Sequence, residues 1–362
     1  MKLLVVAGEP SGDLRAAELL RELRKRSEVH AFGMGGDRML AGGVDLHFHH
    51  RDLSVMGFLE VLTSLPKLLG VARALKRRAL AESPDAVVLV DYPGFNLRFA
   101  SWAHSHGLRV IYYVSPQLWA WGRGRMRKVR SCVDLMITLF RFEKDLYREN
   151  GVNAFWSGHP LVDEIPEPLP EGGADLALLP GSRRQEVRHL LSPMIGAFEL
   201  LRDRGLVERA RIAVSPYLDE SAYGSVLDHP LIRGCADIES ALLPCRAAAV
   251  CSGTATLETA LYGRPFVIGY RTSLVSYLLA RMLVRELDHI GMANLVARKE
   301  VAPELVQRRA SAEGLAEALD PLLRNAEARE RARERLGEVR KALGPPGSAS
   351  RAAARITEEL GG

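Results

Sequence analysis

The sequence predicts an α/β protein made of two Rossmann-like domains, whose parallel sheets face each other across a cleft. Three observations lead to this prediction. A chain of 362 residues is longer than a single hydrophobic core usually supports, which favours two domains. Short apolar runs ending in glycine or proline alternate with longer amphipathic segments, as in βαβ units. The alternation stops at a proline-rich stretch, residues 160–173, and then begins again.

The first half contains five short apolar runs that we expect to form buried strands. They are residues 3–7, 29–33, 86–90, 109–114 and 135–139. Between the first two, residues 8–12 are expected to form a loop and residues 14–25 a helix, with Asp13 as its N-cap. Residues 142–150 have the spacing of another helix. The expected N-terminal domain covers residues 1–165.

The second half repeats this order of elements. Strands are expected at residues 176–179, 211–214, 247–251 and 265–268. Helices are expected at residues 186–202, 324–340 and 349–360. Another helix is expected to start within residues 252–256 and to end at residue 262. The expected C-terminal domain covers residues 174–344. Residues 345–362 would form a separate terminal helix that can pack back on the N-terminal domain.

Composition narrows the class of protein. The formal net charge of +5 suits anionic partners such as phosphates, nucleic acid or an acidic membrane face. The most apolar stretch, residues 53–72, contains Glu60 and Lys67 and falls short of the roughly 18 uncharged apolar residues of a membrane span. The four cysteines form no C-x-x-C pair, which is typical of thiols in a reducing compartment. We therefore expect a cytoplasmic protein that can touch a membrane without crossing it.

The clearest candidate ligand site follows the strand expected at residues 247–251. It reads Ser252-Gly253-Thr254-Ala255-Thr256, and Glu258 lies further along the same helix. Small residues let a diphosphate approach the backbone, and the amides and dipole of a helix start favour anionic oxygen. Glu258 can accept hydrogen bonds from ribose hydroxyls. Ordinary helix capping by Thr254 explains the same spacing, so both interpretations stay open.

Two more loops are expected at the same edge of the second sheet. Ser182 and Arg183 follow the strand at 176–179, and Arg271 follows the strand at 265–268, directly after Tyr270. The planar guanidinium group of arginine suits phosphate oxygens. The alternative for both loops is an exposed arginine without a ligand.

The loops of the first half carry polar groups of other kinds. The segment from Gly8 to Asp13, which includes Ser11, lacks the spacing of a known phosphate loop, but it can hold sugar hydroxyls. Asp91 ends the strand at 86–90 and can act as a general base toward an acceptor hydroxyl. A structural aspartate in a turn is an equal alternative. Gln117 lies in a loop with two tryptophans, which either stack on a ligand ring or pack under the loop.

A histidine-rich segment raises the question of a metal site. His47, His49 and His50 lie close in sequence, but no acidic or cysteine partner has ligand spacing from them. We therefore predict no metal site and a solvated strand end instead.

Residues 55–69 are apolar almost all round and precede the basic residues Arg73, Lys76, Arg77 and Arg78. This pattern fits a core helix followed by a basic surface, and equally an acyl-chain site or a surface that dips into an acidic bilayer. A second basic stretch, residues 123–130, has no interleaved aromatic residues for base stacking. We therefore predict no nucleic-acid partner.

Ten motifs occur in a specific order along nearly the whole chain. They are residues 6–13, 55–57, 91–96, 113–121, 142–144, 158–160, 178–183, 252–258, 269–271 and 294–295. Together they resemble the lipid-A-disaccharide synthase family, whose members are inverting glycosyltransferases with the GT-B fold. One position departs from the family: some members carry a second aspartate, a suspected base, where this chain has Gly94.

The resemblance implies transfer of 2,3-diacylglucosamine from UDP-2,3-diacylglucosamine to the 6-hydroxyl of 2,3-diacylglucosamine 1-phosphate. The products would be a β-1,6 disaccharide and UDP. The N-terminal domain would bind acceptor and lipid, and the C-terminal domain the UDP-sugar. No cofactor is implied. The protein would be a monomer or homodimer that contacts the cytoplasmic face of the inner membrane.

The resemblance also implies a role for individual residues. Those expected to bind the UDP donor are Ser182, Arg183, Ser252, Gly253, Thr254, Ala255, Thr256, Glu258, Tyr270, Arg271 and Asn294. Those expected near the acceptor are Gly8, Ser11, Asn96 and Gln117, with Asp91 or Asp13 as the base. Those expected at a lipid or membrane surface are Val55, Met56, Phe58, Leu62, Leu65 and Leu69.

Two other classes of function remain open on the sequence. The first is a UDP-N-acetylglucosamine 2-epimerase or another GT-B enzyme that acts on a UDP-sugar. The second is a non-catalytic protein that binds a nucleotide or a lipid.

Overall fold

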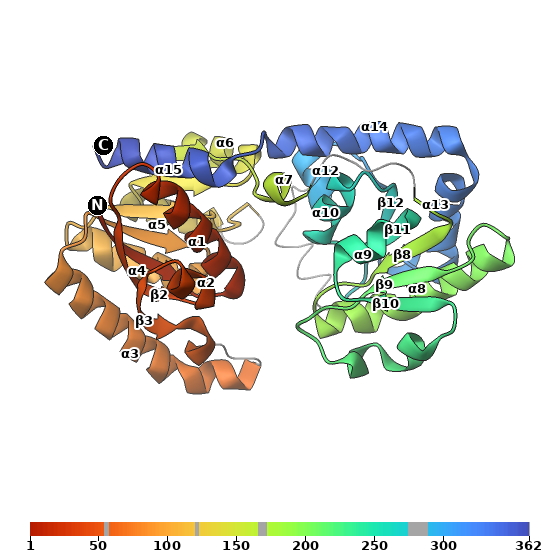
Figure 1. The fold of residues 1–362 in the computed structure, drawn as a ribbon, viewed down its shortest axis with the longest axis horizontal. Helices are drawn as coiled ribbons and strands as arrows, with labels where there is room; N and C mark the ends of the chain where they lie inside the picture. The colour runs from red at the N-terminus through yellow and green to blue at the C-terminus, as the bar shows by residue number, and fades with distance from the viewer. Residues whose placement is uncertain (54–57, 120–122, 166–171, 274–288, 362) are drawn as a thin grey trace. The chain divides into compact units, whose positions relative to one another are not determined.

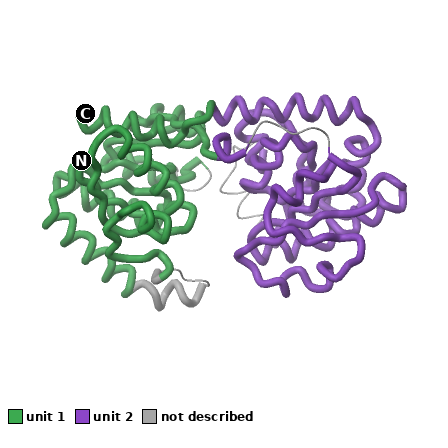
Figure 2. The backbone as a smooth tube through the Cα atoms, viewed as in Figure 1, with its two compact units in different colours: residues 1–160, 345–362 green, residues 161–344 purple. Residues whose placement is uncertain are grey.

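The computed structural model describes residues 1–53, 58–119, 123–165, 172–273 and 289–361 (Figure 1). The chain divides into two compact units, which Figure 2 shows in two colours. Unit 1 consists of residues 1–160 and 345–362, and unit 2 of residues 161–344. Within the described residues, each unit contains one parallel sheet, with seven strands in unit 1 and six in unit 2. The prediction of two parallel α/β sheets is therefore confirmed.

The sheet of unit 1 has the strand order β3-β2-β1-β4-β5-β6-β7. Its strands are β1 (Lys2–Ala7), β2 (His30–Gly35), β3 (Asp45–His49), β4 (Ala86–Val90), β5 (Val110–Tyr113), β6 (Leu135–Thr138) and β7 (Ala154–Trp156). Apart from Lys2 at the start of β1, the central strands β1, β4 and β5 are apolar and buried on both faces, as helices on both sides of a parallel sheet require. This strand order places a switch point between β1 and β4, where loops leave the sheet in opposite directions.

The helices of unit 1 connect these strands. They are α1 (Pro10–Arg24), α2 (Asp37–Ala41), α3 (Phe58–Glu82), α4 (Pro93–Ser105), α5 (Met126–Cys132), α6 (Arg141–Glu149) and the terminal α15 (Ser348–Glu359). Helix α15 packs against α1 (Figure 1). The Ser348 hydroxyl donates to the carbonyl of Gly158, and Arg351 donates to the carbonyl of Ser157. The last 18 residues are therefore part of unit 1.

The sheet of unit 2 has the strand order β10-β9-β8-β11-β12-β13. Its strands are β8 (Asp175–Leu179), β9 (Ala210–Ala213), β10 (Ile232–Cys235), β11 (Cys245–Cys251), β12 (Phe266–Tyr270) and β13 (Glu304–Val306). Its helices are α7 (Leu161–Glu164), α8 (Arg184–Asp203), α9 (Ile238–Leu242), α10 (Ala255–Leu261), α12 (Met292–Ala297), α13 (Ala312–Arg324) and α14 (Ala326–Leu343). The switch point of this sheet lies between β8 and β11.

The start of α1 differs from the prediction. The helix begins at Pro10 with Glu9 as its N-cap residue, so residues 10–12 are helical instead of forming a loop. Proline suits the first turn of a helix, because its missing N–H has no partner there and its φ angle is preset. Asp13 therefore lies inside α1 and does not cap it.

Candidate functional site

The strand order places candidate ligand sites at the carboxyl ends of the central strands of each sheet. In unit 1 the loops after β1, β4 and β5 end at this edge, and in unit 2 the loops after β8, β11 and β12 do so. Apart from Tyr270 and Asn294, the polar residues predicted for the donor and acceptor sites lie in these loops or in the first turns of the helices that follow.

Asp91 directly follows β4 and has an unusual backbone. Its φ angle is 49° and that of the next residue, Tyr92, is 47°. Two consecutive non-glycine residues in the left-handed region are uncommon and are typical of a constrained functional turn. The turn is held by the Asn96 amide and the Tyr112 hydroxyl, which both donate to the Asp91 carbonyl oxygen, at 2.7 and 2.6 Å.

The side chain of Asp91 is well suited to proton transfer. Burial, reinforced by the negative charge of Glu9, raises the pKa of this carboxyl from 3.8 to about 6. A carboxylate that titrates near neutral pH is a better general base than an ordinary aspartate, and it is still ionised at pH 7.

Gly8 and Asn96 support this turn. A Cβ atom on Gly8 would lie 2.2 Å from the Tyr92 ring, so glycine is needed where that ring covers the end of β1. Asn96 is fully buried, and its amide also donates to the carbonyl oxygens of Val6 and Val90. The Asn96 Oδ1 atom has no hydrogen-bond partner within the described residues. In this structure both residues shape the turn at Asp91.

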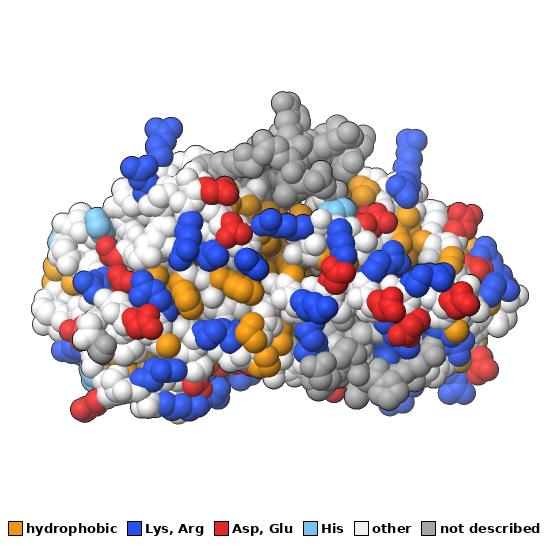
Figure 3. Space-filling model, turned by 90° about the horizontal axis from the view of Figure 1, so that it is seen from above, with side chains coloured by type: hydrophobic (Ala, Val, Ile, Leu, Met, Phe, Trp, Pro, Cys, Tyr) orange, Lys and Arg blue, Asp and Glu red, His pale blue; other side chains and the backbone are white. Residues whose placement is uncertain are grey.

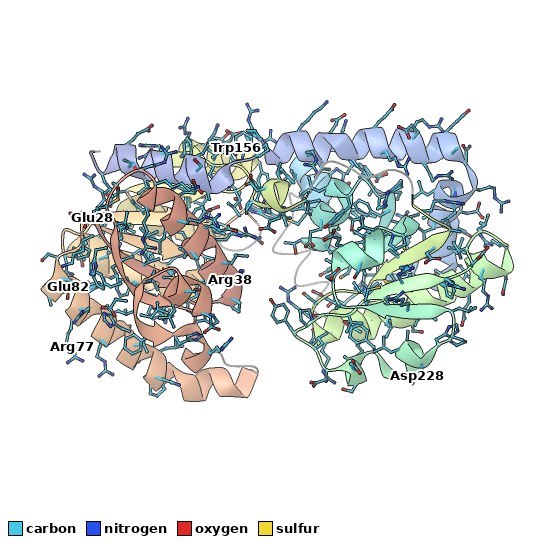
Figure 4. The ribbon with its side chains drawn as sticks, in the orientation of Figure 1. Glu28, Arg38, Arg77, Glu82, Trp156 and Asp228 are labelled. Carbon is cyan, nitrogen blue, oxygen red and sulfur yellow. The ribbon has the colours of Figure 1, made fainter. Side chains whose placement is uncertain are left out.

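Asp13, the other candidate base, is occupied by backbone contacts. Its buried carboxylate accepts hydrogen bonds from the amides of Gly36, Arg38 and Met39, at 2.7, 3.0 and 3.1 Å. These amides belong to the start of α2, where Arg38 is labelled in Figure 4. Asp13 therefore ties α1 to α2, and the geometry favours Asp91 over Asp13 as the base.

Glu143 is a buried acid that was not among the site residues predicted from the sequence. It lies in the first turn of α6 with 2% of its surface exposed. Its carboxyl accepts hydrogen bonds from the Ser115 hydroxyl at 2.8 Å and from the Trp119 indole N–H at 2.9 Å. Burial, with a smaller effect of the Asp91 charge, raises its pKa from 4.5 to about 7. The available signal was its position within the motif Phe142-Glu143-Lys144, just after a strand.

The loop after β11 in unit 2 has the predicted position at a helix start. Within the described part of the chain, the backbone amides of Gly253, Thr254 and Ala255 make no hydrogen bond. The Ser252 hydroxyl donates to the Ile290 carbonyl, and Thr254 is exposed. Three successive unpaired amides can approach an anionic oxygen.

Thr256 and Asn294 have internal partners. The buried Thr256 hydroxyl donates to the Gly253 carbonyl and accepts from the Ala293 amide, which links α10 to α12. The buried Asn294 side chain uses all its polar atoms on Ala302, Glu304 and the amide of Val301. In this structure these two side chains hold the loop after β11 in place.

The loop after β8 lies beside that loop. A Cβ atom on Gly181 would lie 3.2 Å from the Cys251 sulfur, which shows how closely the two strand ends approach. Glu186 accepts from the amides of Ser182 and Arg183 at the start of α8. The Arg183 guanidinium pairs with Glu186 at 2.8 Å and is 81% exposed. Arg183 is therefore accessible to an anionic ligand at the carboxyl edge of β8.

Glu258 also differs from an ordinary surface acid. Burial, with a contribution from the Glu164 charge, raises its pKa from 4.5 to about 7. Tyr270 ends β12, and Arg271 follows it half-buried. Perturbed acids and an arginine at one sheet edge are common features of a binding site.

The remaining candidates are described only in part. Ser11 and Gln117 are exposed. Val55 and Met56 lie outside the described residues, as do the side chains of Phe58, Leu62 and Leu65 on α3. Leu69 is 49% exposed on the same helix. The described helices include none long and apolar enough to span a bilayer.

The histidine segment lies at the end of β3, outside these loops. His49 contacts Asp37 at 3.1 Å, and Arg51 pairs with the same carboxylate. Among the described residues no group of three or more His, Cys, Asp or Glu side chains has the arrangement of a metal site. On the face drawn in Figure 3, the described Lys and Arg side chains are interspersed with Asp and Glu over each unit.

Two units, each with a parallel sheet covered by helices, define the GT-B fold class. Solved structures with this fold cover 99% of the chain. One, titled a putative UDP-N-acetylglucosamine 2-epimerase from Listeria monocytogenes, has a TM-score of 0.66, 15% identity and 96% coverage of its own chain. Another, the calicheamicin glycosyltransferase CalG4, has a TM-score of 0.62, 16% identity and 98% coverage. At this identity the likeness concerns the fold alone.

Comparison of sequences is more specific. The family model described as lipid-A-disaccharide synthetase matches residues 3–356. The lipid-A-disaccharide synthase of Myxococcus xanthus is 39% identical over 99% of this chain and 97% of its own. The lipid-A-disaccharide synthase of Syntrophus aciditrophicus is 40% identical over 97% of this chain and 96% of its own. The chain belongs to the lipid-A-disaccharide synthetase family, and it is a glycosyltransferase of lipid A disaccharide synthesis.

Proposed function

We propose that the enzyme transfers 2,3-diacylglucosamine from UDP-2,3-diacylglucosamine to the 6-hydroxyl of 2,3-diacylglucosamine 1-phosphate. Asp91 takes the proton of the acceptor hydroxyl as that oxygen bonds to the anomeric carbon. The bond from this carbon to the diphosphate breaks, and UDP leaves with the electron pair. A single displacement of this kind inverts the anomeric centre and gives a β-1,6 disaccharide.

The observation that carries this proposal is the turn at Asp91. The turn holds a carboxyl at the end of a central strand, in a backbone conformation that two partly buried hydrogen bonds maintain. Its pKa of about 6 leaves it ionised yet basic at neutral pH. Asp13 lacks this combination, because its carboxylate already accepts three amide hydrogen bonds.

For the donor, we propose a site on unit 2 that needs no metal. The unpaired amides of residues 253–255, together with Arg183 and Arg271, would stabilise the negative charge that develops on the leaving diphosphate. Glu258 would accept hydrogen bonds from the ribose hydroxyls. Thr256 and Asn294 would not contact the donor. They would position the loop after β11, because their polar atoms already make hydrogen bonds within unit 2.

Acylated substrates lie in a membrane, so we also propose peripheral contact with the cytoplasmic face of the inner membrane. Helix α3 supports this contact: Leu69 and Leu80 are 49% and 53% exposed, and Arg73 and Arg77 are exposed on the same helix. Figure 4 labels Arg77 on α3. This combination of apolar and basic side chains suits an anionic interface.

The test is an assay of UDP release with defined substrates. We expect release from UDP-2,3-diacylglucosamine only when 2,3-diacylglucosamine 1-phosphate is added, with a β-1,6 disaccharide phosphate as product. Interconversion of UDP-N-acetylglucosamine at carbon 2 would point to an epimerase instead. Binding of UDP without turnover of any acylated pair would contradict the transferase proposal.

A further inference from the structure

The loop after β5 is held in a strained position. Val114, which precedes it, has a φ angle of 63°, and this left-handed conformation is unusual for a β-branched residue. Strand β5 is the neighbour of β4, and the Asp91 amide donates to the Tyr113 carbonyl at 3.0 Å. The loop therefore leaves the sheet beside the proposed base.

Two consecutive residues of α6 fix this loop. Glu143 accepts from the Ser115 hydroxyl and from the Trp119 indole N–H. The ring of Phe142 meets the Trp119 ring edge to face, with centroids 5.4 Å apart. Trp119 is thus held both through its N–H and through its ring, and Ser115 is held at the other end of the loop.

Gln117 lies between Ser115 and Trp119, the two residues that Glu143 holds. Gln117 is exposed, whereas Ser115, Pro116 and Leu118 are buried. A short loop with buried anchors on both sides presents its one exposed polar side chain in a defined position. Glu143 itself is too deeply buried to meet a substrate, since it has 2% exposure.

We infer that Glu143 is a positioning residue for acceptor recognition, which acts by fixing the loop from Ser115 to Trp119 beside Asp91. The inference rests on the proposed function. It assigns Glu143 no contact with substrate, and it predicts that hydrogen-bonding capacity at this position matters more than charge. Fixing the loop lowers the cost of ordering it when the acceptor binds.

The experiment compares Glu143→Leu with Glu143→Gln. Leucine removes both hydrogen bonds, whereas glutamine can accept from the Trp119 N–H and donate to the Ser115 hydroxyl. We expect E143L to raise the KM for the acceptor about tenfold, the effect of losing roughly one net hydrogen bond, with the KM for the UDP-sugar within about twofold. We expect E143Q to remain within about threefold of the wild type. Glu149→Leu, at the exposed end of the same helix, is the matched control.

A second measurement reports on the loop without turnover. The chain has four tryptophans, so 5-fluorotryptophan labelling gives four fluorine resonances, and Trp119→Phe identifies that of Trp119. We expect E143L to shift and broaden this resonance and E143Q to leave it nearly unchanged. Failure of the wild type to transfer sugar would refute the proposed function, and the Trp119 resonance would still test the loop.

Three results would overturn the inference. The first is an equal rise in KM for donor and acceptor in E143L. The second is an E143Q variant as impaired as E143L, which would show that the charge is what matters. The third is an E143L variant with wild-type acceptor KM or an unchanged Trp119 resonance.

Discussion

Replacing Asp13 by asparagine separates a structural from a chemical role for this carboxylate. Its Oδ1 atom accepts from the amides of Gly36 and Met39, and its Oδ2 atom accepts from that of Arg38. Asparagine has one carbonyl oxygen, so it can keep the first two hydrogen bonds but presents an NH₂ group to the Arg38 N–H. The variant therefore loses one charge-assisted hydrogen bond and weakens two others.

The size of the effect follows from these contacts. A hydrogen bond to a charged group contributes about 1.5–3 kcal/mol, and a neutral one about half as much. Loss of one bond and weakening of two lowers the free energy of unfolding of unit 1 by about 3 kcal/mol. Asp37→Asn is the control, because this exposed residue of α2 makes surface ion pairs, which contribute less than about 1 kcal/mol.

The assay is urea unfolding combined with hydrogen exchange of the amides of residues 36–41, because a protein with two compact units need not unfold in one step. We expect faster exchange in D13N and an unchanged pH dependence of kcat/KM in the protein that remains folded. A loss below about 1 kcal/mol would refute the structural role. A changed pH dependence of kcat/KM together with an unchanged free energy of unfolding would indicate that Asp13 acts as the base.

Three further predictions concern the site itself. Asp91→Asn should lower turnover about 10²–10⁴-fold. Because the base acts when ionised, wild-type kcat/KM should rise with pH through about 6 and then level off, and a pH series of D91N should lack this limb. Arg183→Ala should lower turnover strongly with normal thermal unfolding, since the backbone amide still donates to Glu186; near-normal turnover would remove Arg183 from the donor site. Gly94→Asp should change the free energy of unfolding by less than about 1 kcal/mol. A Cβ atom at this position meets no atom within 4 Å, and a carboxylate suits the first turn of α4. A larger loss of stability in urea unfolding would contradict this prediction.

The sequence predicted the central strands well, because strands buried on both faces form continuous apolar runs. The expected strand at residues 86–90 is β4 without change, and that at 247–251 lies within β11. It missed β7, β10 and β13, which have three, four and three residues. Strand β10 also carries an exposed arginine and a glycine. Segments so short and mixed acquire their conformation from pairing with a neighbouring strand, which no local pattern reveals.

For the candidate site, the sequence predicted which loops meet at a sheet edge but not which side chains remain available. Spacing grouped Thr256 with Thr254, and the family resemblance added Asn294. Thr256 and Asn294 are nevertheless buried and spend their polar atoms on internal hydrogen bonds. Asp13 is a similar case, since its partners lie 23 to 26 residues away in the chain. Hydrogen bonds between distant segments decide availability, and a single sequence does not contain them.

The residues with left-handed backbones are fixed by buried side chains that differ from the side chains proposed to contact the substrate. Asp91, Tyr92 and Val114 have left-handed backbones at the ends of two neighbouring strands. Each such residue costs about 1–3 kcal/mol, so the conformation persists only where surrounding contacts enforce it. Those contacts come from buried groups: Asn96 and Tyr112 hold the Asp91 carbonyl, and Glu143 holds the loop after Val114. We propose that these contacts serve to present Asp91 and Gln117 at one edge of the sheet, as the roles proposed for the two side chains require.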